Sequence, residues 1–205
     1  MLTLIKHIDS GSEIVWSPNY TLNMSNFKKK FDDKPSVIKG IMKRIAVSYL
    51  LYDIDFDLKF TEDKKKFRIN KIKLQTLFDQ DYSYLNLKEL KIQNVSQKQI
   101  DFLILHEQGH FDLRETLKSK MERDIASKSK GKIFTTKGSD FQEIEHNANV
   151  KAGKFLQPLY EKISQDVKKH EDLYDKKTNH GRNKQKQIQY NRQFKQFRKI
   201  RTSSK

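Results

Sequence analysis

The sequence predicts an α+β fold in which a small twisted antiparallel or mixed sheet packs on one buried helix and on a second long helix. Three observations predict it: apolar residues alternate over residues 44–75, helical periodicity begins at Ser96, and a second helical stripe begins at Ser139. The 205 residues suffice for one domain, or for one domain with an appendage. We expect a single domain over 1–183, followed by a basic amphipathic helix or tail over 184–205.

The predicted sheet lies in the first third of the chain. Residues 12–17 fit one short strand, and residues 44–60 alternate between apolar and polar side chains. The alternation slips phase near Tyr52, which predicts a bulge or bend there. A charged turn at 62–66 then returns the chain through 67–75, so the two long segments predict a hairpin in the same sheet as the first strand.

Three segments predict irregular structure. Residues 26–40 are polar and contain a proline, so they predict a loop with room for a short helix. Residues 79–95 mix polar and aromatic side chains without a clear period. The polar segment 127–138 predicts a surface loop.

Three helices are expected. Ser96 and a glutamine three positions later match a capping box, and apolar residues recur after it at helical spacing. The second helix is expected to start at Ser139 and to end before residue 173, with Pro158 kinking or splitting it. The third is amphipathic, with apolar residues Ile188, Phe194, Phe197 and Ile200.

The chain is strongly basic, with a net charge of +16. Residues 176–205 contain 11 Lys or Arg and no Asp or Glu, and further lysine clusters lie at 28–30 and 64–66. Such clusters favour contact with anionic surfaces, and we expect the basic tail to make it. The lack of cysteine excludes thiolate metal ligands, and no apolar run suits a transmembrane segment. The first residues turn polar too soon for a signal-peptide core.

His106, Glu107 and His110 form an H-E-x-x-H motif within the first predicted helix. Histidines four residues apart lie one turn apart on one helix face, so both imidazoles can reach one ion. The glutamate beside the first histidine can accept a proton from a metal-activated water, as a zinc peptidase requires. The alternative is a core helix with two hydrogen-bonded histidines, but a buried, unpartnered Glu107 would be unfavourable. The motif therefore predicts Zn²⁺ bound by His106 and His110, with Glu107 as general base.

A zinc hydrolase also needs a third protein ligand and an open position for water. Glu143 and Glu145 lie on the next predicted helix, and either would complete a His-His-Glu set. His180 precedes a glycine in a predicted turn, where a backbone bend can direct the ring inward. Tyr174 and Asp175 lie close enough in sequence to orient that imidazole or to bind substrate oxygen. The residues alone leave His180 and the two glutamates as equal candidates.

Two segments resemble a known family. The run His-Glu-Gln-Gly-His-Phe-Asp at 106–112, together with the run from 174 to 181, resembles a bacterial domain family of unknown function described as predicted secreted zinc-dependent proteases. Residues 14–17 and 22–27 are similar to the opening of that family, and the glutamine-rich closing helix is similar to its end. The likeness therefore spans most of the chain, from about residue 13 to residue 200.

The resemblance implies a zincin-like peptidase that acts on protein or peptide substrates with Zn²⁺. It implies His106 and His110 as ligands and Glu107 as general base, and it favours His180 as the third ligand. Tyr174 is then expected to stabilise the oxyanion. Secretion or a place in the cell envelope is implied as well, although the chain shows no export signal and the basic tail is not part of the resemblance.

Asp175 is expected to orient a histidine or to cap the turn, and Gln108 and Asp112 to serve packing or to orient a ligand. Two other functions stay open. The chain is alternatively an inactive polyanion-binding protein with a structural metal site, which the basic tail and its interleaved aromatic residues favour. A zinc amidase that acts on cell-wall peptides would carry the same motif.

Overall fold

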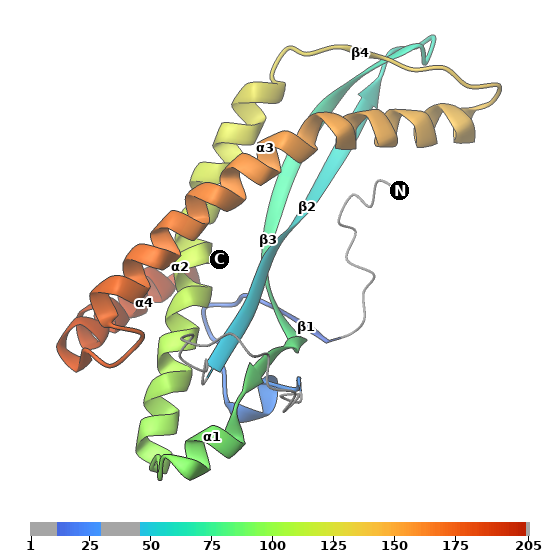
Figure 1. The fold of residues 1–205 in the computed structure, drawn as a ribbon. Helices are drawn as coiled ribbons and strands as arrows, with labels where there is room; N and C mark the ends of the chain where they lie inside the picture. Colours follow the sequence, from blue (N-terminus) through green and yellow to red (C-terminus); the bar gives the residue numbers. More distant parts are fainter. Residues whose placement is uncertain (1–11, 30–45, 204–205) are drawn as a thin grey trace. The chain divides into compact units, whose positions relative to one another are not determined.

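The computed structural model describes residues 12–29 and 46–203, which form an α+β fold (Figure 1). The strands are β1 (Glu13–Val15), β2 (Ala46–Phe60), β3 (Lys66–Leu85) and β4 (Phe134–Thr135). The helices are α1 (Leu87–Ile92), α2 (Gln97–Ser129), α3 (Phe141–Thr178) and α4 (Lys184–Ser203), and a 3₁₀ turn spans Met24–Asn26. The predicted fold class, with a small antiparallel sheet and several helices, is confirmed.

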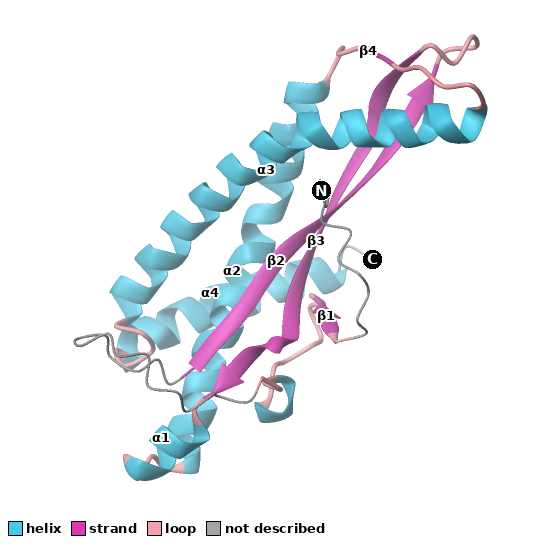
Figure 2. Ribbon diagram, turned by 45° about the vertical axis from the view of Figure 1, so that its right-hand side comes forward, coloured by secondary structure: helices cyan, strands magenta, loops and turns pink. Residues whose placement is uncertain are grey.

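The sheet has β3 between β1 and β2, and β4 pairs with β3 (Figure 2). β1 runs antiparallel to β3 with Ile14 opposite Phe78, and β4 runs antiparallel to β3 with Phe67 opposite Phe134. The predicted hairpin and the first short strand therefore share one sheet, as expected.

β3 is longer than predicted, because it continues through residues 79–85. The residues from Thr76 to Asp79 are all buried, so the alternation that marks a one-sided strand disappears there. α1 follows at once, with Asn86 accepting a hydrogen bond from the Glu89 amide at its N-terminus. Residues 30–40 of the predicted loop at 26–40 lie outside the described residues.

α2 begins where the sequence predicts, and Gln99 Oε1 accepts a hydrogen bond from the Ser96 amide as in a capping box. α3 differs from the expectation in both its start and its end. Asp140 caps its N-terminus, and the helix runs without a break through Pro158 to Thr178. Pro158 and Lys154 are both exposed, so water can satisfy the carbonyl that the proline leaves without an amide partner.

The described residues form two compact units, and β2, β3, α2 and α3 contribute to both. One unit comprises Tyr52–Gln75 and Leu117–His170, and its buried core includes Phe67, Ile125 and Leu156. The other, which we call the site unit, comprises 12–29, 46–51, Thr76–Thr116 and 171–203. Its core contains Leu22, Phe78, Leu85, Ile104 and Phe111.

No helix in the described part of the chain is long and apolar enough to cross a membrane, in line with the sequence. α4 belongs to the site unit, where Gln187 and Phe194 are buried. The boundary expected between residues 183 and 184 therefore does not coincide with a boundary between compact units, because α4 belongs to the same unit as the residues before it.

Candidate metal site

α2 brings His106 and His110 to one side of the helix, one turn apart. Their ring centroids lie 4.9 Å apart, and the side chains are 3% and 13% exposed respectively. Ile104 and Phe111 on the same helix pack into the core of the site unit, which fixes the helix against β3. The spacing predicted from the motif is therefore realised with both imidazoles in one place.

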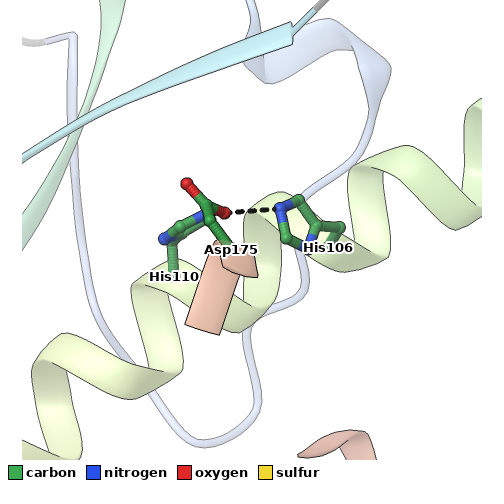
Figure 3. Close-up of side chains that lie close together, drawn as sticks. All are labelled: His106, His110 and Asp175. Carbon is green, nitrogen blue, oxygen red and sulfur yellow. Dashed lines mark hydrogen bonds and ion pairs between the residues drawn. The ribbon is translucent and has the colours of Figure 1, made fainter. Parts of the chain in front are cut away.

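Asp175, three residues before the end of α3, lies between the two histidines (Figure 3). Its Oδ1 atom is 3.1 Å from Nε2 of His106 and 2.9 Å from Nε2 of His110. These three donor atoms lie within 4.8 Å of one another, and they form the cluster with metal-ligand chemistry among the described residues.

This cluster fits a zinc ion in donor type and spacing. Imidazole nitrogen and carboxylate oxygen both bind Zn²⁺ at ~2.1 Å, so donors in a tetrahedral site lie roughly 3.4 Å apart. The distances of 2.9 and 3.1 Å between the carboxylate oxygen and the two Nε2 atoms are close to that value. Two histidines and one carboxylate also leave a fourth position for water, as a catalytic site needs.

The electrostatics of the cluster favour a cation at its centre. Burial opposes ionisation of Asp175, but its contacts with His106 and His110 hold the pKa of its carboxyl below the ordinary value. Burial lowers the pKa of His110, but the hydrogen bond to Asp175 and the charge of Glu107 outweigh burial, so that pKa is raised. The Asp175 carboxylate therefore stays negatively charged, and this negative charge would attract a divalent cation as it stabilises the proton on His110.

Glu107 is 7% exposed and lies beside this cluster on α2. The Ser48 hydroxyl, on β2, donates a hydrogen bond to Glu107 Oε2. The carboxylate is therefore buried with a partner, which removes the penalty of an unsatisfied buried charge.

The other ring nitrogen of His106 has its own partner. Nδ1 lies 2.9 Å from Oε1 of Gln187, a fully buried residue of α4. Gln187 Nε2 donates to the Tyr174 hydroxyl at 2.7 Å, and this hydroxyl donates to the main-chain oxygen of His106 at 3.2 Å. The Tyr174 ring stacks on the His106 ring at 4.9 Å between centroids.

Two glycines allow this close packing around His106. A Cβ atom on Gly109 would overlap the Tyr174 hydroxyl and lie 2.7 Å from its Cζ. A Cβ on Gly181 would lie 3.0 Å from Cβ of His106, and Gly181 also has a φ of +79°. Asn179 and His180 before it have φ values of 49° and 51°, so the chain turns back sharply as α3 ends.

His180 lies outside the cluster of three donors. Its side chain is 70% exposed, and its Nδ1 is 3.6 Å from Oδ2 of Asp175, the carboxylate oxygen that faces away from the other two histidines. The third donor in this structure is thus Asp175 in place of the predicted His180.

The alternative glutamate ligands have other surroundings. Glu143 is exposed, and its Oε2 accepts hydrogen bonds from the amide and hydroxyl of Ser139 at the start of α3, which hold its pKa below the ordinary value. Glu145 is exposed on the same turn. Neither belongs to a metal-ligand cluster among the described residues.

Tyr174 lies in the site beside His106, but its side chain is buried and does not face solvent. The side chain is 1% exposed, and its hydroxyl is occupied by Gln187 and the His106 carbonyl. Burial raises the pKa of Tyr174 far above its ordinary value, so the phenol stays neutral. These contacts orient His106, and an oxyanion role for Tyr174 stays a prediction.

Gln108 and Asp112 have the packing roles that the sequence suggests. Asp112 accepts hydrogen bonds from the Trp16 indole at 2.8 Å and from the Arg198 guanidinium at 2.9 Å, which tie the residue after β1 and helix α4 to α2. Gln108 Oε1 accepts from the Leu22 amide at 2.7 Å. These two polar residues, on the side of α2 away from the histidines, therefore fasten the helix to its neighbours.

Sequence reasoning did not identify Ser48 or Gln187. Ser48 is a lone serine on a strand and carries no local signal. Gln187 is one of several glutamines in α4, and only its place on the apolar side of the helix, seven residues before Phe194, marks it as buried. For Asp175 the sequence predicts a residue that orients a histidine or caps the turn, not a metal ligand.

Comparisons of the chain with protein-family models, with curated proteins and with solved structures gave no match.

Proposed function

We propose that this protein is a zinc-dependent metallopeptidase with a zincin-like fold, in which His106, His110 and Asp175 hold the metal and Glu107 is the general base. One observation carries the proposal: three donor atoms from two helices converge within 4.8 Å of one another, next to a buried glutamate. The resemblance of the two motifs to predicted zinc-dependent proteases supports the peptidase activity, although it favours His180 in place of Asp175 as the third ligand.

The side chains of the site have separate tasks in this proposal. Glu107 accepts a proton from the attacking water as the new C–O bond forms at the carbonyl carbon. It then delivers that proton to the amine nitrogen as the peptide C–N bond breaks. Ser48 donates a hydrogen bond to Oε2 of Glu107 and so fixes the carboxylate. The other oxygen, Oε1, is then the one that accepts and delivers the proton. When bound, zinc supplies Lewis acidity, which lowers the pKa of a water molecule to roughly 7 and polarises the scissile carbonyl.

The decisive experiment is the substitution Glu107→Gln. We expect the purified wild-type protein to bind about one equivalent of zinc, and we expect the variant to retain that zinc. Its rate of peptide hydrolysis should fall by roughly 10²- to 10⁴-fold, which is the usual contribution of a general base. Undiminished hydrolysis with the metal retained would remove Glu107 from the mechanism.

Glu143→Gln is a suitable control, because Glu143 is an exposed glutamate that was also a candidate ligand. It should change neither zinc content nor hydrolysis. A panel of protein substrates and of cell-wall peptides then separates a peptidase from an amidase, since both classes share the metal chemistry.

A second candidate function, binding to a polyanion, has one observation in its favour. α4 has no acidic residue, and four of its cations lie exposed at helical spacing: Lys184, Arg192, Lys195 and Lys199. This face would attract nucleic acid or another polyanion whether or not the protein hydrolyses peptides. Binding without hydrolysis of any substrate in the panel would favour this function over the peptidase.

A further inference from the structure

Gln187 is a fully buried amide near the start of α4 that the catalytic scheme above does not use. Its Oε1 is 2.9 Å from His106 Nδ1, and its Nε2 donates to the Tyr174 hydroxyl and, at 2.8 Å, to Asn191 Oδ1. A buried glutamine with all its polar atoms engaged is well ordered, because each alternative rotamer would leave a polar atom unsatisfied.

The partners of Gln187 determine which atom it presents to His106. Both amide hydrogens are used by Tyr174 and Asn191, so the atom that faces His106 is the oxygen, which accepts. The Tyr174 hydroxyl can receive one of these hydrogens because its own hydrogen goes to the His106 carbonyl. The network thus leaves an acceptor opposite Nδ1.

An acceptor opposite Nδ1 selects one form of the imidazole. A neutral ring that binds a metal through Nε2 must carry its proton on Nδ1. The His106 ring is nearly inaccessible to water, so that proton needs an acceptor within the protein. Gln187 Oε1 supplies it, so the lone pair of Nε2, which lies 3.1 Å from Asp175 Oδ1, is the one that would bind a metal.

We propose that Gln187 is a positioning residue of the metal site, which holds His106 in the Nδ1–H form with Nε2 directed at the metal. The inference rests on the proposed function for the identity of the ion. It also makes α4 a part of the site, because a residue from the basic C-terminal segment orients a ligand on α2.

Zinc titration of three full-length variants tests the proposal. Gln187→Leu replaces the hydrogen-bond acceptor with an apolar side chain that still fills the buried position. The zinc affinity of this variant should fall roughly 10- to 100-fold. Gln187→Glu retains an acceptor, and the Tyr174 hydroxyl and the Asn191 amide can turn to donate to it, so it should restore the affinity. Gln193→Leu is the matched control: it makes the same change at an exposed glutamine of α4 and should leave the affinity unchanged.

A spectroscopic measurement on the wild-type chain keeps the proposal testable if Gln187→Leu does not fold. In protein labelled with ¹⁵N-histidine and loaded with cadmium, the metal should couple to Nε2 of His106, and Nδ1 should carry a slowly exchanging proton. Coupling to Nδ1, or rapid exchange at Nδ1, would overturn the proposal. So would wild-type zinc affinity in a folded Gln187→Leu protein. Absence of any zinc or cadmium binding by the wild-type protein would instead contradict the proposed function.

Discussion

Asp175 and His180 lie within one short stretch of chain, and both can serve as a metal ligand by residue type. Asp175 Oδ1 is about 3 Å from both imidazole Nε2 atoms, whereas Nδ1 of the exposed His180 ring is 3.6 Å from the other oxygen of that carboxylate. In the proposed function the carboxylate of Asp175 is therefore the third ligand, and His180 is not.

Asp175→Asn should therefore abolish tight zinc binding. The amide keeps the shape of the side chain but removes the negative charge, and we expect a loss larger than the roughly 10- to 100-fold typical of residues that only orient a ligand. His180→Ala is the control and should bind zinc with nearly wild-type affinity. Metal analysis and competition with a chelator measure both. Retention by Asp175→Asn together with loss in His180→Ala would make His180 the ligand.

The raised pKa of His110 predicts how zinc affinity depends on pH. In the metal-free protein His110 holds a proton below that pKa, and zinc must displace it. Affinity should thus fall about tenfold per pH unit as pH drops below the pKa of His110, and it should level off above that pKa. Asp175 adds no competition there, since its pKa is lowered. Affinity that stays constant as pH falls below the ordinary histidine pKa would contradict this.

The sequence predicts His106, Glu107 and His110 because their relation is local: three residues on one helical turn have a fixed geometry. Asp175 and Gln187 enter the site through tertiary packing, 69 and 81 positions away from His106 in sequence, and no local pattern specifies such a pairing. Their identity depends on which faces of α3 and α4 pack against α2.

At the scale of elements, periodicity predicts the hairpin and the three long helices, because one buried face imposes a regular spacing. Prediction from periodicity fails in segments where buried and exposed residues do not alternate regularly. β3 is buried on both sides from Thr76 to Asp79. α3 continues past Pro158 to Thr178, and the exposed Lys154 lies where water can replace the amide partner that the proline removes. The extra turns of α3 matter for function, since they carry Tyr174 and Asp175 to α2.

Gly109→Ala tests how closely these helices pack. In an isolated helix, alanine would stabilise by ~1 kcal/mol relative to glycine. Here its Cβ would overlap the Tyr174 hydroxyl, and overpacking a core usually destabilises by roughly 1–3 kcal/mol. Because Tyr174 is fully buried and stacked on His106, we expect net destabilisation in chemical denaturation, together with weaker zinc binding.

The same substitution in a Tyr174→Phe background provides the control for Gly109→Ala. Removing the hydroxyl relieves the worst overlap, so the alanine should destabilise less there than in the wild-type protein. A Gly109→Ala variant at least as stable as the wild type would show that α2 and α3 leave room for a methyl group between Gly109 and Tyr174.

The whole molecule has a net charge of +16, and two differently charged regions could bind two kinds of ligand, a metal ion and a polyanion. The candidate metal site is rich in carboxylates, whereas the exposed face of α4 is cationic. These α4 side chains take no part in the donor cluster, so the two properties should respond independently to substitution.

Replacing Lys184, Arg192, Lys195 and Lys199 with glutamine should therefore weaken polyanion binding and leave peptide hydrolysis unchanged. With random duplex DNA as the probe, the plot of log affinity against log salt should become less steep by roughly 0.9 for each lost phosphate contact. The matched control removes the same number of exposed lysines elsewhere, at Lys128, Lys154, Lys162 and Lys168. Because acidic residues lie among them, such as Glu161 and Asp166, these lysines should contribute less. An equal change of slope in both variants would mean that net charge alone attracts the polyanion, and that α4 is not a dedicated surface for it.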